Sequence, residues 1–137
     1  MLSLSDPSLL KSSAFVGGQW IKSAKRFAVK SPSTGETVAE VADLGAEDTR
    51  QAIEAASAAF PAWKKFLAKE RAALLRKWFY LMMANQEDLA RIMTAEQGKP
   101  LAESRGEIAY GASFIEWFGI EDYLEVKYLA VGGLGDV

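Results

Sequence analysis

The chemistry open to this chain is set first by two residue types that it lacks. Its 137 residues include no cysteine and no histidine. A thiolate nucleophile, an imidazole base, a disulfide and a zinc site built from these side chains are therefore excluded. Catalysis by this chain would have to use serine, lysine, tyrosine or carboxylate side chains.

One carboxylate pair has a spacing that suits acid–base chemistry. Glu103 and Glu107 stand four residues apart in a segment of helical periodicity, which places both on one helix face. Like charges at this spacing more commonly share a solvated surface, and we favour that interpretation.

Aromatic residues are a second candidate for a binding surface. A set of six could mark a ligand groove: Trp63, Trp78, Phe79, Phe114, Trp117 and Phe118. Positions in a core, present or former, are the simpler explanation, and the same holds for packing by Tyr110.

The elements that position these residues centre on a long amphipathic helix over 68–98. Apolar side chains recur there every three or four residues, and the residue types are strong helix formers. Glu87 and Arg91 form a favourable i,i+4 pair on its wet side. Gly98 suits the left-handed position after a helix, and Pro100 suits the start of the next one.

Shorter elements precede this helix. Strands are predicted over 14–21, 26–32 and 36–42, with Gly17-Gly18 at a turn or bulge and Gly35 in a turn. A helix capped by Gly45 is predicted to run to about residue 59 and to be ended by Pro61, with Trp63 packing in the cleft beside the long helix. The fold class is therefore an α-rich α+β arrangement with short N-terminal strands and three helices.

The last segment is open to two interpretations. Residues 124–130 alternate between two sets of side chains, which favours a C-terminal strand. The alternative is that the third helix, which begins at Pro100, continues through 121–131.

Composition limits the classes of partner. Lysine and arginine number 16 against 18 acidic residues, a net charge of −2 with the signs interspersed, so nucleic-acid binding is not expected. The longest apolar run, 78–84, is too short to cross a membrane. The polar lead-in of residues 1–13 is expected to be flexible and lacks the apolar core of a signal peptide. We expect a cytoplasmic protein.

Several segments resemble one known family. They are FVGGQW, SPSTGE, AAFPAWK, the long run ending in EQGKP, and GEIAYGASFIEWF. On these motifs, residues 14–118 resemble the start of the NAD(P)-dependent aldehyde dehydrogenases, within them the succinate-semialdehyde dehydrogenase branch. This part would be the N-terminal portion of the cofactor-binding domain.

Residues 119–134 resemble a different part of the same family. GIEDYLEVKYLAVGGL is similar to the extreme C-terminus, where members form a strand of the oligomerisation sheet. The resemblance therefore implies a join near Phe118–Gly119 and an oligomerisation strand and tail over 119–137.

The resemblance also implies which functional groups are missing. Family members use a cysteine thiolate, a glutamate and an asparagine to oxidise an aldehyde with NAD or NADP. No residue here is assigned as catalytic or cofactor-binding. The glycines at 132, 133 and 135 have no helix after them to present to a pyrophosphate.

One metal site is implied in the same way. Val29, Lys30 and Glu96 match positions that hold a structural monovalent cation in some members. A surface carboxylate beside a strand end is the interpretation that we favour.

Three functional hypotheses follow. The first is a truncated aldehyde dehydrogenase whose parent activity is not catalysed by this chain alone. The second is a non-catalytic interaction module that associates with intact dehydrogenase subunits or with itself, its C-terminal strand joining their sheet. The third is an enzyme with new chemistry.

Overall fold

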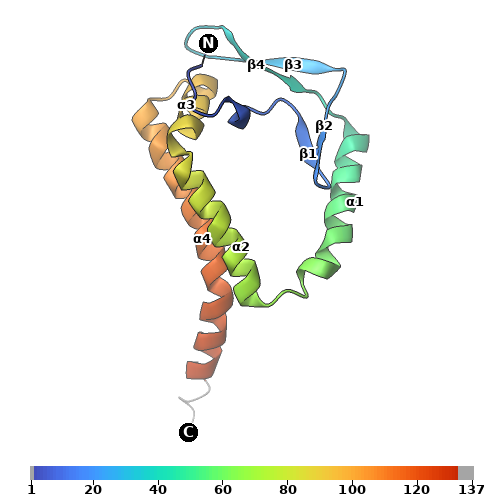
Figure 1. Cartoon of the computed structure of the whole chain (residues 1–137), viewed down its shortest axis with the longest axis vertical. Helices are drawn as coiled ribbons and strands as arrows, with labels where there is room; N and C mark the ends of the chain where they lie inside the picture. The colour runs from blue at the N-terminus through green and yellow to red at the C-terminus, as the bar shows by residue number, and fades with distance from the viewer. Residues whose placement is uncertain (1, 133–137) are drawn as a thin grey trace.

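The computed structural model describes residues 2–132, with side chains to residue 117. This part of the chain contains four α-helices and four short strands (Figure 1). A 3₁₀ turn, Pro7–Leu9, precedes them, and the elements are β1 (Ala14–Val16), β2 (Gln19–Ile21), β3 (Arg26–Lys30), β4 (Thr37–Ala42), α1 (Ala46–Trp63), α2 (Ala68–Ala84), α3 (Gln86–Gln97) and α4 (Leu101–Gly132). The α-rich α+β class is confirmed, with four helices where three were predicted.

The strands form two separate antiparallel hairpins. Ala14 pairs with Ile21 in the first, and its turn is Gly17-Gly18 with φ of 57° and 83°. Two consecutive positive φ angles match the twist of a two-residue hairpin and favour glycine. In the second hairpin Arg26 pairs with Ala42, and Gly35 (φ 73°) lies in the turn. The predicted turn positions are confirmed, whereas the single strand predicted over 14–21 is wrong, because the turn at Gly17-Gly18 divides it into β1 and β2.

The predicted long helix is divided at Asn85, which ends α2 and precedes α3. Its backbone leaves the helical region at φ −108°, and its side-chain amide donates to the Leu81 carbonyl at 2.8 Å. An asparagine side chain competes in this way with the helical backbone. The single helix over 68–98 is therefore wrong at this residue, whereas its predicted end at Gly98 (φ 74°) is confirmed.

The predicted C-terminal strand is also wrong. The helix that begins at Leu101 continues to Gly132, so the alternative of a continuous helix holds. A strand needs a partner for its backbone N–H and C=O groups, whereas a helix pairs them within itself. The remaining glycines of the terminal cluster lie outside the described residues.

Helix α1 is longer than predicted. Pro61 lies inside it, and the Lys64 N–H still donates to the Phe60 carbonyl at 3.0 Å. At the other end the Asp48 carboxylate accepts from the Gly45 N–H at 2.9 Å, which confirms the cap. Trp63 does not fill a cleft between helices: it is 37% exposed and contacts the Phe66 ring.

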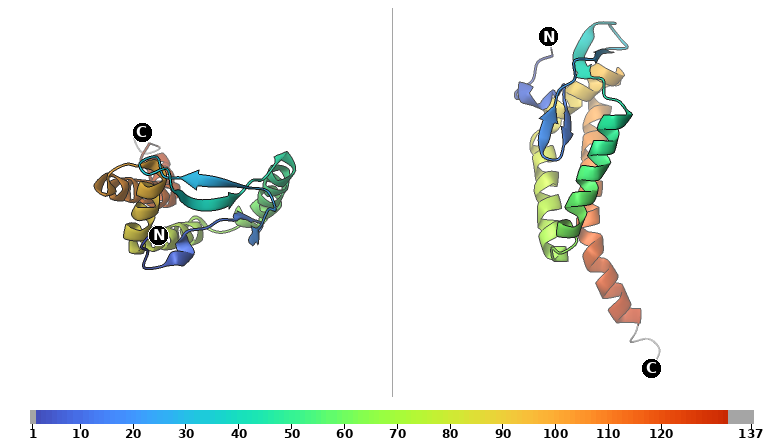
Figure 2. Two further views of the ribbon diagram at one scale, coloured as in Figure 1. Left: turned by 90° about the horizontal axis from the view of Figure 1, so that it is seen from above. Right: turned by 90° about the vertical axis from the view of Figure 1, so that its right-hand side faces the viewer.

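The helices pack unevenly. Helix α4 lies along α2 and α3, whereas α1 stands on the other side of the molecule and makes its main contact with β1 (Figures 1 and 2). Only three apolar residues of the described part are classed as buried, Ala90, Ile108 and Ala112, all on α3 and α4. No helix among the described residues is long and apolar enough to cross a membrane.

Candidate functional site

The three residues of the predicted cation site come from two elements. Val29 and Lys30 end β3, and Glu96 lies exposed in the last turn of α3. The two neighbourhoods meet, because a methyl group placed on Gly98 would lie 2.7 Å from Pro32 Cγ. The described residues contain no cluster of three or more histidine, cysteine or acidic side chains placed for a metal. A cation here would have to rely on backbone carbonyls beside one carboxylate, and the site stays a prediction.

The carboxylate pair on α4 is a surface feature. Glu103 and Glu107 are both exposed, and Glu107 forms an ion pair with Lys99. The interpretation as a solvated face is confirmed.

A better organised polar cluster joins α3 to α4 and is centred on Glu87. Its carboxylate accepts from Arg105 Nε at 2.7 Å and Nη2 at 3.0 Å, and from Arg91 Nε at 3.0 Å. The hydrogen bonds from Arg105, and then the one from Arg91, lower the pKa of Glu87 from its ordinary value of 4.5 to about 2. Sequence periodicity indicated the Arg91 contact and missed Arg105, which lies across the turn at Gly98.

A second carboxylate, Asp88, holds the N-terminal segment. It is only 5% exposed and accepts from the backbone N–H of Ser5 at 3.0 Å and of Asp6 at 2.8 Å. Arg91 adds a hydrogen bond to the Ser3 carbonyl at 3.0 Å. Sequence analysis missed this contact, since its partners are more than eighty residues apart. Both clusters join one element to another.

The helix N-termini bear on nucleotide binding. Each of the four helices has a carboxylate in its first turn: Glu47 and Asp48, Glu70, Glu87 and Asp88, and Glu103. In α1 and α2 that carboxylate also accepts an N–H at the helix start, Gly45 and Leu67 respectively. A pyrophosphate would need these N–H groups and would meet like charge there. The starts of α1 and α2 are therefore already occupied by carboxylates of the chain itself.

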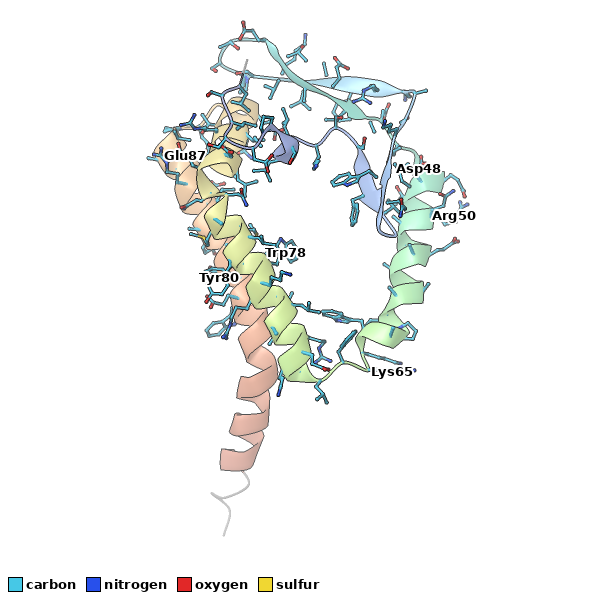
Figure 3. The ribbon with its side chains drawn as sticks, viewed as in Figure 1. Asp48, Arg50, Lys65, Trp78, Tyr80 and Glu87 are labelled. Atoms are coloured by element: carbon cyan, nitrogen blue, oxygen red, sulfur yellow. The ribbon has the colours of Figure 1, made fainter. Side chains whose placement is uncertain are left out.

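The aromatic residues do not form a core. Trp78 is 55% exposed, Tyr80 60%, Tyr110 66% and Trp117 53%. Trp78 points into the space between α2 and α1, whereas Tyr80 points to the opposite side of α2 (Figure 3). Tyr110 contacts Phe114 edge-on at 4.7 Å between ring centroids. Trp78 and Trp117 are therefore not in a present core, whereas the interpretation of former-core positions stays a prediction, and packing by Tyr110 agrees with its contact with Phe114.

A comparison of the sequence with models of known protein families agrees with the resemblance seen in its motifs. Residues 20–124 match the model of the aldehyde dehydrogenase family. The chain therefore belongs to the aldehyde dehydrogenase family.

Individual relatives place it near the semialdehyde dehydrogenases. It is 54% identical to the glutarate-semialdehyde dehydrogenase of Pseudomonas aeruginosa, over 88% of this chain and 25% of the relative. It is 50% identical to the NADP⁺ succinate-semialdehyde dehydrogenase of Escherichia coli, with the same two shares. The solved succinate-semialdehyde dehydrogenase of Burkholderia pseudomallei matches with a TM-score of 0.84 and 55% identity, over 87% of this chain and 25% of that one.

Other solved members of the family are complexes with the cofactor. PnpE in complex with nicotinamide adenine dinucleotide matches at 29% identity with a TM-score of 0.78, over 83% of this chain and 24% of that one. The chain thus spans about a quarter of the length of the relatives it matches.

Proposed function

We propose that this chain is a scaffold segment of an NAD(P)-dependent semialdehyde dehydrogenase and does not catalyse the reaction alone. The parent activity would be oxidation of a semialdehyde to its acid. Two observations together carry the proposal. The chain is 50% to 54% identical to semialdehyde dehydrogenases, and it contains no cysteine. Without a thiolate, the nucleophilic step that the family resemblance implies has no residue to perform it.

The polar contacts support a scaffold role. Glu87 holds α4 to α3, and Asp88 holds the N-terminal segment to α3. Carboxylates also lie in the first turns of α1 and α2, where they would repel a phosphate. The same proposal assigns NAD or NADP to the parent protein and a cytoplasmic location to the chain, which cell fractionation tests.

The test is a steady-state assay of the purified chain. Succinate semialdehyde or glutarate semialdehyde is mixed with NAD⁺ or NADP⁺, and reduced nicotinamide is followed by absorbance. The expected rate equals that of buffer, while the P. aeruginosa relative serves as the positive control. Aldehyde-dependent reduction by the chain would establish the enzymatic alternative and overturn the proposal.

A second candidate is a non-catalytic module that associates with intact dehydrogenase subunits. It is favoured by the large apolar side chains left exposed, among them Phe60, Trp78 and Trp117. Light scattering of the chain mixed with an intact relative tests it, and a mass equal to the two unmixed components would contradict it.

A further inference from the structure

The turn between α1 and α2 combines exposed apolar side chains with lysines. We call residues 60–69, which end α1 and begin α2, the α1–α2 corner. Its four large apolar side chains are between 37% and 65% exposed: Phe60, Trp63, Phe66 and Leu67. Its three lysines are exposed as well: Lys64, Lys65 and Lys69. The corner lies at the far end of α1 and α2 from the β3–β4 hairpin, and Lys65 points outward from it (Figures 1 and 3).

The stretch around the corner is basic, although the chain as a whole is acidic. Residues 55–86 contain six lysines and arginines and one acidic residue, Glu70, whereas the net charge of the chain is −2. The interspersion of signs along the whole sequence therefore does not hold here. Glu70 is itself engaged, because its carboxylate accepts from the Leu67 N–H at 2.8 Å. A basic helical stretch with exposed aromatic side chains is typical of contact with an anionic membrane surface.

Short-range contacts hold the groups of the corner together. The Phe66 carbonyl accepts from Arg71 Nη1 at 3.1 Å, and the Phe66 N–H donates to the Trp63 carbonyl at 3.1 Å. The ring centroids of Trp63 and Phe66 are 5.9 Å apart, and Lys64 Nζ lies 5.9 Å from the centroid of the Phe60 ring. Apolar and cationic groups are thus presented on one ordered turn, so the turn does not have to be ordered when it binds.

The size of the corner favours a lipid surface over a protein partner. The corner spans residues 60–69, whereas one side of a standard protein–protein interface contributes about 20–30 residues. A bilayer surface needs no matching pocket. Aromatic and aliphatic side chains enter its headgroup region, while lysine side chains extend toward the lipid phosphates. Near an anionic surface each lysine strengthens binding by about fivefold.

We propose that the α1–α2 corner docks this chain on the surface of a membrane that contains anionic lipid. Phe66 and Leu67 enter the headgroup region, and Lys64 and Lys65 face the lipid phosphates. The contact is made with one leaflet and does not cross the bilayer. It depends only on the residues of the corner, so it does not rest on the proposed scaffold function.

The experiment is co-sedimentation of the full chain with vesicles. Vesicles of equal parts phosphatidylcholine and phosphatidylserine are compared with vesicles of phosphatidylcholine alone. The chain should bind the anionic vesicles, with an affinity that falls as ionic strength rises. The double variant Lys64→Gln with Lys65→Gln should bind about 25-fold more weakly. The matched control, Lys11→Gln with Lys22→Gln, removes two exposed lysines that flank the β1–β2 hairpin and should bind less than about threefold more weakly.

A second pair of variants tests the apolar part of the corner. Leu67→Ser should weaken binding to the anionic vesicles by about tenfold, because it removes an aliphatic side chain from the headgroup region. Leu67 is the N-cap residue of α2, a position at which serine is favoured, so α2 is retained. Ile53→Ser is the control, since Ile53 is 61% exposed on α1 outside the corner, and it should weaken binding by less than about threefold. Circular dichroism confirms equal helix content.

Several results would overturn the proposal. One is equal binding to both kinds of vesicle, and another is an equal loss from the corner variants and their controls. A third is the absence of vesicle binding. In that case, a dimer in light scattering that Leu67→Ser dissociates would assign the corner to a second copy of this chain, and binding to polyglutamate would assign it to an acidic polypeptide.

Discussion

The contact between Gly98 and Pro32 gives the sharpest test of how the β3–β4 hairpin is held against α3. Gly98 has φ 74°, and a Cβ added there would lie 2.7 Å from Pro32 Cγ. In Gly98→Ala the left-handed backbone costs about 1 kcal/mol. Because the proline ring is tied to the backbone, relief of the clash adds about 1–3 kcal/mol. Together the two costs should lower the free energy of unfolding of Gly98→Ala by about 2–4 kcal/mol.

Gly35→Ala is the matched control. Gly35 has almost the same φ, 73°, and nothing lies within 4 Å of an added Cβ. Its substitution therefore carries the backbone cost alone, about 1 kcal/mol. The double variant with both Pro32→Ala and Gly98→Ala removes the clash. Its loss of stability should be about 1–3 kcal/mol smaller than the sum of the losses of the two single variants.

Native-state amide hydrogen exchange is the suitable assay, because it reports local opening rather than one global transition. Gly98→Ala should speed exchange of the α3 amides by about 30-fold or more, since each 1.4 kcal/mol is tenfold. Gly35→Ala should raise exchange in the β3–β4 hairpin by about fivefold. Equal effects of Gly98→Ala and Gly35→Ala on exchange would refute the contact between Pro32 and Gly98. So would a double variant whose loss of stability equals the sum of the two single losses.

Two further predictions concern the acidic residues of α3. Asp88→Ala removes the acceptor for Ser5 and Asp6, so limited proteolysis of the N-terminal segment should accelerate by about tenfold, consistent with about 1–3 kcal/mol for a lost charged acceptor; an unchanged cleavage rate would contradict the contact. The pKa of Glu87 falls from 4.5 to about 2 on folding, so its contribution to helix stability is complete above pH 4.5 and lost as pH falls toward 2. Circular dichroism of wild type and Glu87→Gln should diverge above pH 4.5 and converge toward pH 2, and parallel curves would contradict the ion pair with Arg105.

The turns could be predicted because their cause is local. Gly17-Gly18, Gly35 and Gly98 lie at positions that need positive φ, and a short window of sequence contains both the need and the residue that meets it. The pair between Glu87 and Arg91 is local in the same sense.

The remaining features depend on which elements meet. The alternation after residue 119 favoured a strand, but a strand without a neighbour cannot pair its backbone, and α4 continues instead. Arg105 reaches Glu87 only because the turn at Gly98 folds α4 back along α3. The candidate cation residues were indicated by resemblance alone, and what the fold adds is the approach of Pro32 to Gly98.

The central claim, that this chain does not oxidise aldehydes by itself, is tested most directly under single-turnover conditions. The chain is held in molar excess over NADP⁺ with succinate semialdehyde, so that even one slow turnover per molecule is visible as reduced nicotinamide. The claim predicts a trace that matches buffer over many hours. Reduced nicotinamide that accumulates in proportion to the chain, and only when aldehyde is present, would contradict it.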